Sequence, residues 1–143
     1  MYIEFRKLND KAVTPTKTHS TDAGFDLVCT SIMEGGFDSE TITYGTGIAV
    51  NIPEGYVGLL CSRSSVYKKD LMQNNAVGII DAGYTGELIF KFRKMQPYSH
   101  RYELGDKIGQ LVIVPLPYVE LQEVTEFSEK TERGECGFGS SGK

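Results

Sequence analysis

The sequence has few cysteines and no long hydrophobic run. Its three cysteines, Cys29, Cys61 and Cys136, are odd in number and show neither C-x-x-C spacing nor a nearby histidine pair. We therefore expect reduced thiols and no cysteine-bound metal. No apolar run approaches membrane-spanning length, and "MYIEFRKLND" reaches a charge at its fourth residue. We expect no signal peptide, no membrane partner and a cytoplasmic location.

An excess of positive charge is also lacking. The 15 Lys and Arg against 19 Asp and Glu give a formal net charge of -4, whereas a general nucleic-acid binder is normally basic on at least one face. We predict no nucleic-acid partner. The 143 residues fit one domain with a single core, and we see no internal repeat or linker. We expect a core over about residues 1–130 and a flexible C-terminal tail over about 131–143.

Short strand patterns dominate what is present. "ELIFKFR" at 87–93 and "YIEFRKL" at 2–8 alternate apolar and polar residues, as half-buried strands do. Further strands are expected at 25–29, 47–52, 56–61, 76–80, 108–114 and 118–124, with turns at 34–36, 52–55, 81–86 and 104–106. Many short strands without alternating helices predict an all-β fold, a jelly-roll-like barrel or sandwich.

Two local structures are expected between these strands. One short helix is predicted over 64–73, with Ser64 or Ser65 as its N-terminal cap. The turn "DAGYTG" is predicted to reverse the strand at 76–80 into the strand at 87–93, giving a β-hairpin. Such a hairpin would frame a slot with Asn75 near one end and Asp81 and Tyr84 near the other.

Several polar residues beside these strands have two interpretations. Asp26 interrupts an apolar run, and we expect its carboxylate to lie at a strand edge, bonded to backbone. Arg63 could pair with a carboxylate or with a phosphate. Ser64 and Ser65 could cap the helix and thereby direct backbone amides toward an anion. Asp81 could be a turn former or a base that takes a proton from water.

The segment "GDKIGQLVIVP" at 105–115 begins as a turn and becomes a strand. Asp106 is most simply a turn residue, and Lys107 a solvated charge. Gln110 is a polar side chain inside an apolar run, and an inward Gln needs partners.

The final "GFGSSGK" fits G-x-x-x-x-G-K, the body of a P-loop. A P-loop needs a helix whose N-terminal amides face the phosphates, and the sequence ends at Lys143 before such a helix. We therefore expect no P-loop. An aromatic residue, Phe138, in this polar stretch indicates a tail that docks on something.

The order of "AGFDL", "SRSS", "NNAVGIIDAGYTGEL", "GDKIGQLVIVP" and the Gly/Ser-rich tail resembles the five motifs of the homotrimeric deoxyuridine triphosphatases. This family hydrolyses dUTP to dUMP and pyrophosphate, which keeps uracil out of DNA and supplies dUMP for thymidylate synthesis. The resemblance covers almost the whole chain. It departs from the common family pattern at Ser62, Gly83, Lys107, Gly109 and Ser141, where many relatives have Pro, an acidic residue, Arg, Ala and Thr respectively.

The resemblance implies a role for each matched residue. Asp81 would be the general base, and Asp26 would reach water on a Mg²⁺ cofactor held mainly by the substrate phosphates. Asn75 and the backbone of the hairpin, including Gly78 and Ile80, would bind uracil, while Tyr84 would pack on the deoxyribose. The phosphates would be held by residues from two segments and the tail: Arg63, Ser64, Ser65, Gln110, Arg133, Gly139, Ser140 and Ser141. Phe138 would stack over uracil as the tail closes, and each site would be shared by three subunits.

Two alternatives remain at this point. A dCTP deaminase has a related trimeric fold and some shared phosphate-holding residues, but "GIIDAGYTGE" and the complete tail fit triphosphate hydrolysis better. A regulatory module that binds dUTP without turnover is disfavoured by the presence of Asp81 and Arg133.

Overall fold

The computed structural model describes residues 1–35, 39–129, 131, 132, 134 and 135, and nearly all of its regular structure is strand. In chain order the elements are β1 (Glu4–Lys7), β2 (Gly24–Val28), β3 (Ser31–Glu34), β4 (Thr41–Asn51), β5 (Tyr56–Ser62), η1 (Ser64–Lys69), β6 (Leu71–Gln73), β7 (Gly78–Ile80), β8 (Glu87–Lys94) and β9 (Lys107–Pro115).

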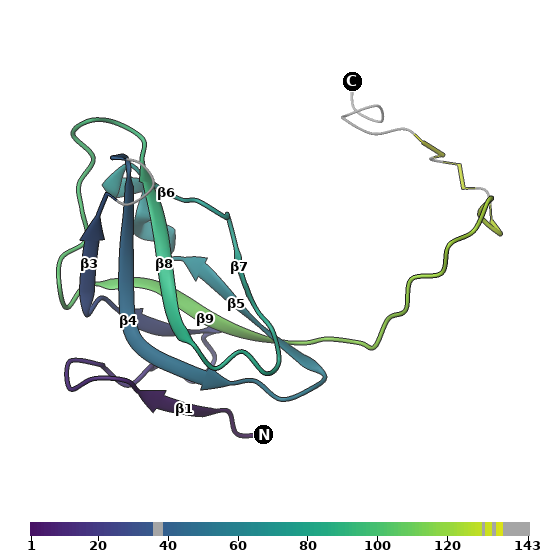
Figure 1. Cartoon of the computed structure of the whole chain (residues 1–143), viewed down its shortest axis with the longest axis horizontal. Helices are drawn as coiled ribbons and strands as arrows, with labels where there is room; N and C mark the ends of the chain where they lie inside the picture. Colours follow the sequence, from purple (N-terminus) through teal and green to yellow (C-terminus); the bar gives the residue numbers. More distant parts are fainter. Residues whose placement is uncertain (36–38, 130, 133, 136–143) are drawn as a thin grey trace.

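These strands form two antiparallel sheets (Figure 1). The first has the order β1-β4-β8-β6, with β3 also pairing with β4, and the second has the order β2-β9-β5-β7. Buried apolar side chains from both sheets form one core between them. The predicted all-β, jelly-roll-like sandwich is confirmed.

The alternation along β8 builds much of that core. Leu88, Phe90 and Phe92 are at most 1% exposed, whereas Ile89 between them is 42% exposed. The ring of Phe92 packs edge-on against Tyr44 of β4 at 5.8 Å between centroids, a favourable aromatic geometry. The sequence pattern of this strand therefore predicted its buried face correctly.

The long strand β4 bends at a bulge between Gly45 and Ala49 (Figure 1). Gly47 adopts a φ of +65°, and a side chain there would come within 2.7 Å of the Asn9 amide. Its N–H donates to the Glu87 carboxylate (2.7 Å). Glycine meets both requirements because it tolerates positive φ and has no Cβ. The bulge thus anchors the first residue of β8, and with it the end of the preceding loop.

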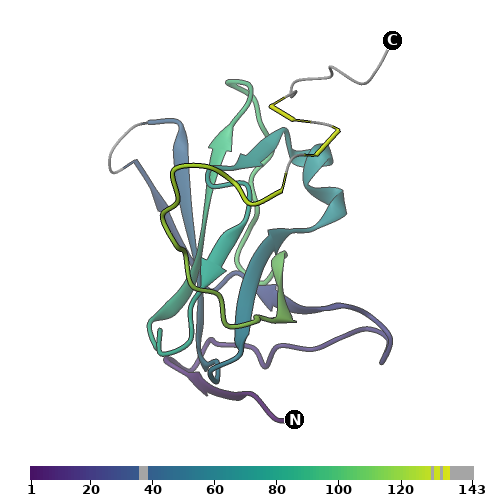
Figure 2. The same ribbon diagram turned by 90° about the vertical axis from the view of Figure 1, so that its right-hand side faces the viewer.

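The predicted helix over 64–73 is only partly correct. The helix, drawn as one short coil in Figure 2, is a 3₁₀ turn that ends at Lys69. Asp70 then adopts a left-handed conformation and β6 begins. Its N-cap is Arg63, without a side-chain capping hydrogen bond, so the prediction of Ser64 or Ser65 as the cap is wrong. Among the described residues, no helix has the length and apolar character needed to cross a membrane.

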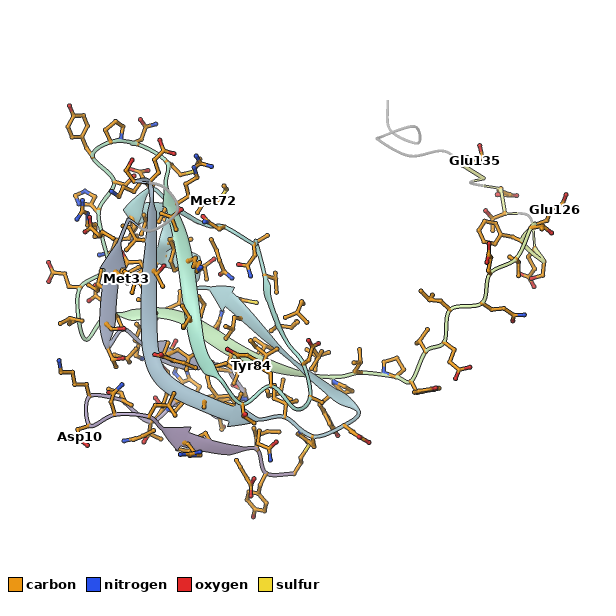
Figure 3. All side chains as sticks on the ribbon, viewed as in Figure 1. Asp10, Met33, Met72, Tyr84, Glu126 and Glu135 are labelled. Atoms are coloured by element: carbon orange, nitrogen blue, oxygen red, sulfur yellow. The ribbon has the colours of Figure 1, made fainter. Side chains whose placement is uncertain are left out.

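The predicted strand over 118–124 is wrong. These residues are exposed and have no paired strand within the described chain, and the segment after β9 runs away from the sheets (Figures 1 and 3). Glu126 lies on this extension, far from the core (Figure 3). An alternating pattern gives a strand only where a neighbouring strand accepts its backbone hydrogen bonds.

Candidate active site

The first part of the candidate site is a polar depression at the Arg63 end of the second sheet. Antiparallel pairing sets Asp26 of β2 opposite Gln110 of β9, and Gln110 opposite Cys61 of β5. Arg63 follows the end of β5. A depression of about 280 Å³ results. It is lined by Thr18, Asp22, Ala23, Gly24, Asp26, Arg63, Ser64 and Gln110.

Asp26 lies at the centre of an ion-pair cluster. Its Oδ2 accepts a hydrogen bond from Lys107 Nζ at 2.7 Å, and its Oδ1 lies 3.3 Å from Arg63 Nε. The carboxylate side chain is only 14% exposed. The expectation of a carboxylate bonded to backbone is therefore wrong, as is that of Lys107 as a solvated charge. Desolvation of a carboxylate requires compensating cations, and this cluster holds Arg63 in a fixed position.

Gln110 and Asp22 complete the polar lining. The Gln110 side chain lies against Gly24, where a Cβ would come within 2.4 Å of Gln110 Oε1. Asp22 Oδ2 accepts a hydrogen bond from His19 N–H (2.9 Å), which lowers the pKa of this carboxyl below its ordinary 3.8. Asp22 is therefore an anion at neutral pH. Asp22 was not singled out from the sequence, although it directly precedes the segment "AGFDL".

The side chains that line this depression determine what kind of Mg²⁺ site it could form. Within the described part of the chain, no group of three or more His, Cys, Asp or Glu side chains is arranged to hold a metal ion. Asp26 already pairs with two cations. These residues fit a Mg²⁺ ion that takes most of its ligands from water and phosphate, with carboxylates reached through water. They do not fit an all-protein cage.

Ser64 and Ser65 are the first two residues of the helix that follows Arg63. This helix has six residues, and Ser64 is exposed while Ser65 is half-buried. Of the two serines, Ser64 lines the depression. The structure therefore brings Asp26, Arg63, Ser64 and Gln110 together and leaves Ser65 outside the lining.

The second part of the candidate site is the segment around β7. β7 pairs with β5, through Gly78 with Leu60 and Ile80 with Gly58, and the chain then crosses to β8 in the other sheet. The predicted hairpin between 76–80 and 87–93 is thus wrong in its pairing. The turn itself is present: Tyr84 N–H donates to Asp81 C=O at 3.1 Å.

In this turn the side chain of Tyr84 is held by a hydrogen bond, whereas the carboxylate of Asp81 is exposed to solvent. Gly83 has a φ of +86°, a conformation that glycine adopts without strain. Tyr84 O–H donates to Glu87 C=O (3.0 Å), and its ring lies over Gly86, where a Cβ would be 2.5 Å from the hydroxyl. Asp81 is exposed, and its carboxylate pairs with no other described residue.

Asp81 lines a different depression from Asp26. This second depression, of about 750 Å³, lies where the C-terminal extension leaves β9. Its other lining residues are Glu54, Gly55, Tyr56, Val57, Ala82, Leu116, Pro117, Tyr118 and Val119. Tyr84, labelled in Figure 3, lies on the same loop as Asp81. The two parts of the candidate site do not share one depression within the chain.

Strand register gives the scale of that separation. β2 and β7 are opposite edges of the second sheet with β9 and β5 between them, so three spacings of ~4.8 Å place them ~14 Å apart. Asp26 aligns with Cys61, whereas Ile80 aligns with Gly58, so Asp81 lies ~13 Å further along the strands. Asp26 and Asp81 of one chain therefore do not converge on a single phosphorus atom.

The predicted tail residues lie outside the described residues. These are Arg133, Phe138, Gly139, Ser140 and Ser141.

Comparisons with known proteins agree with one another. The dUTPase family model matches residues 10–142. The deoxyuridine 5'-triphosphate nucleotidohydrolase of Nocardia farcinica is 39% identical over 142 residues, covering 98% of this chain and 85% of the relative. That of Hamiltonella defensa is 36% identical over 141 residues, covering 96% and 93%.

Two solved structures are also similar. A mutant Staphylococcus bacteriophage 80alpha dUTPase with dUpNHpp has a TM-score of 0.86 and 37% identity, with 99% of each chain covered. A mutant dUTPase from phage phi11 of S. aureus, described with a structural Mg(II) ion, has a TM-score of 0.74 and 34% identity, with 90% of this chain and all of that chain covered.

Proposed function

The chain belongs to the dUTPase family and hydrolyses dUTP, and we propose that it does so with Asp81 as general base in a site shared between subunits. The observation that carries the shared site is the separation of Asp81 from the Asp26–Arg63 cluster within one chain. The base and the phosphate-binding groups must come within contact distance of one triphosphate. A second copy of the chain supplies the missing half.

The proposed assembly is a homotrimer. The segment after β9 presents a series of exposed apolar residues: Leu116, Tyr118, Val119, Leu121, Val124 and Phe127. Exposed apolar side chains on an extended segment that leaves the core are typical of an arm that packs on another subunit. In this arrangement the arm carries the tail to a neighbouring site, where the resemblance assigns it the role of a lid.

The reaction begins with water at the α-phosphorus. Asp81 takes a proton from the water as its oxygen bonds to phosphorus, and the bond from phosphorus to the bridging oxygen of the β-phosphate breaks. Pyrophosphate leaves with the electron pair and dUMP remains. Asp81 suits this role because its carboxylate is exposed and unpaired among the described residues, whereas Asp26 is engaged by two cations.

Charge developing on the pyrophosphate is stabilised on the other side of the site. Arg63 is held by Asp26 with its side chain 37% exposed, so its guanidinium is positioned to face a ligand. Ser64 and Gln110 provide uncharged hydrogen-bonding groups in the same depression. Magnesium, when bound to the triphosphate, would neutralise phosphate charge. Asp26 and Asp22 would then accept hydrogen bonds from its water ligands.

The base and sugar would bind at the β7 segment. Asn75 and the backbone at Gly78 and Ile80 would meet the polar edge of uracil. Tyr84, held by its hydrogen bond to Glu87 C=O, would pack on the deoxyribose and leave no room for a ribose 2′-hydroxyl. In the tail, Phe138 would cover uracil, while Arg133, Ser140, Ser141 and the amide of Gly139 would contact the phosphates.

The experiment is nucleotide chromatography after incubation with dUTP or dCTP and magnesium. The proposal predicts dUMP and pyrophosphate from dUTP, and almost none of either with Asp81→Asn, which still binds dUTP. Formation of dUTP from dCTP would instead identify a deaminase. An Asp81→Asn variant with the rate of the unaltered enzyme would assign the base elsewhere.

A further inference from the structure

A buried glutamine lies beside the segment proposed to bind the base. Gln73 ends β6 in the first sheet, pairs there with Phe92 of β8, and is only 5% exposed. Its Nε2 donates to Leu60 C=O at 2.9 Å and to Asn75 Oδ1 at 3.3 Å. Leu60 belongs to β5 of the second sheet. The Gln73 side chain therefore bridges the two sheets and ends on the Asn75 amide.

The orientation of the Gln73 amide is determined by its surroundings. Both of its contacts are acceptors, a backbone carbonyl and the Asn75 side-chain oxygen. A flipped Gln73 amide would turn an oxygen toward the Leu60 carbonyl, which has no proton to donate. In the observed orientation Oε1 is buried without a hydrogen bond from any described residue. An unsatisfied buried acceptor is destabilising, which indicates that a local role retains this glutamine.

The Gln73 contact determines what Asn75 offers to a ligand. Because Asn75 Oδ1 accepts from Gln73, its Nδ2 is directed elsewhere, and its two N–H donors have no acceptor among the residues that the structure describes. Nδ2 lies beside Gly78, where a Cβ would be 3.5 Å from Nδ2 and 3.0 Å from Leu60 Cβ. Gly78 thus leaves open the space in front of this donor. The exposed face of Asn75 is a hydrogen-bond donor, and an acceptor is its complement.

We propose that Gln73 is a positioning residue that holds the Asn75 side-chain amide with its N–H donors toward the ligand. The site therefore favours a pyrimidine with a carbonyl at C4 over one with an amino group at C4. This inference rests on the proposed role of Asn75 in binding the base. A carbonyl oxygen accepts from Nδ2, whereas the amino group of cytosine would place donor against donor. Without the Gln73 contact, Asn75 rotates its amide and accepts from that amino group. A buried polar group left unpaired gives larger discrimination than shape alone.

The test measures the base pocket without the triphosphate. Equilibrium binding of dUMP and dCMP is compared in the full-length enzyme and in Gln73→Met, which keeps a long unbranched side chain but has no donor. We expect the dUMP dissociation constant to rise about tenfold and the preference for dUMP over dCMP to fall by about the same factor. In dUTP turnover KM rises while kcat is retained, because Gln73 contacts the Asn75 amide and not the phosphate-binding residues.

Two further variants separate this role from a structural one. Asn74→Ala is the matched control, since Asn74 is the exposed neighbour whose amide contacts Thr41 instead; it should leave the preference unchanged. In an Asn75→Ala background, Gln73→Met should change the preference for dUMP over dCMP by less than about twofold, because no Asn75 amide is left to orient. An equal effect of Gln73→Met with and without Asn75 overturns the proposal, as does a folded Gln73→Met with unchanged preference.

Failure of the underlying function gives a different result. If Asn75→Ala leaves the preference for dUMP intact, Asn75 does not bind the base. The proposed role of Asn75 and the positioning role of Gln73 are then both wrong, even though dUTP is hydrolysed. If Gln73→Met does not fold, the unaltered enzyme decides the question by NMR. Side-chain amide protons of Gln73 should exchange with water at least about tenfold more slowly than those of Asn74, and dUMP should shift the Asn75 amide. Equal exchange rates overturn the positioning role of Gln73.

Discussion

Lys107 Nζ lies 2.7 Å from Asp26 Oδ2 and shares this carboxylate with Arg63. Lys107 begins β9 and Asp26 lies on β2, so the antiparallel pairing of these two strands brings the charges together. The family resemblance implies Arg as the common residue at position 107. The lysine retains the charge but forms a single point contact instead of a planar fork.

Removal of this ammonium should weaken both folding and phosphate binding. In Lys107→Met, Asp26 remains largely buried with Arg63 as its remaining cation, so we expect a loss of about 1–2 kcal/mol in unfolding free energy and a severalfold higher KM for dUTP. Lys107→Arg should retain both properties. Denaturant unfolding and steady-state kinetics measure them. Lys68→Met, which removes an ammonium near the Tyr67 ring, is the control and should change neither.

A methyl group at Gly86 should displace Tyr84. The added Cβ would lie 2.5 Å from the Tyr84 hydroxyl, which is the far end of a movable side chain, so Gly86→Ala should fold with a stability loss of only about 1 kcal/mol. We expect a loss of the hydrogen bond to Glu87 and a severalfold smaller preference for dUTP over UTP. Tyr84→Phe removes the same bond without moving the ring and should retain that preference. If Gly86→Ala discriminates as well as the unaltered enzyme, Tyr84 does not exclude the ribose.

Gly109 is adapted to a bulky neighbour. A Cβ there would lie 2.3 Å from the buried Phe90 ring and 3.0 Å from the Cys61 carbonyl. The alanine found in many relatives should therefore destabilise this chain by about 1–3 kcal/mol through overpacking. Thermal unfolding of Gly109→Ala measures the effect. The double variant Gly109→Ala/Phe90→Leu should lose less stability than the sum of the losses in the two single variants. Losses that simply add would contradict a direct contact between the two residues.

Stability should decrease at alkaline pH. Burial raises the pKa of Cys29 from 9.0 to about 11 and that of Tyr44 from 10.0 to about 12. Since the folded protein binds these protons more tightly than the unfolded chain, their contribution is complete below pH ~9 and is lost as pH rises through the folded pKa values.

Cys29→Ala tests this pH dependence. The variant should be less stable at pH 7 because a buried side chain is shortened, but its stability should decline less steeply between pH ~9 and ~11. Denaturant unfolding across this range measures both effects. An identical slope in Cys29→Ala would show that the thiol does not titrate with folding.

Strand positions and buried faces were predicted correctly where the residue pattern of a single strand was sufficient. The alternation of β8 identified Leu88, Phe90 and Phe92 as core residues, and the runs at 56–61 and 108–114 correspond to β5 and β9. Most of the turn signals also held, as the positive φ of Gly55 and Gly105 shows.

Predictions failed where the outcome depended on a distant partner. The chain at 78–94 is divided between two sheets because β7 pairs with β5 and β8 pairs with β4. The sequence of the turn between them does not indicate these pairings. The pattern at 118–124 has no pairing strand within the described chain. Likewise, local sequence marked Lys107 as solvated, and only the register of β2 with β9 supplies its carboxylate.

Complementation between two inactive variants tests whether each active site is shared between chains. Asp81→Asn and Arg63→Ala are assayed separately and after co-refolding in equal amounts, with mixed oligomers verified by native mass spectrometry. If Asp81 and Arg63 of one site come from different chains, random assembly gives intact pairs at about a quarter of the sites. A site shared between chains should therefore recover dUTP hydrolysis toward that fraction. Mixed oligomers with no recovered activity would contradict it and would require both residues to act within one chain.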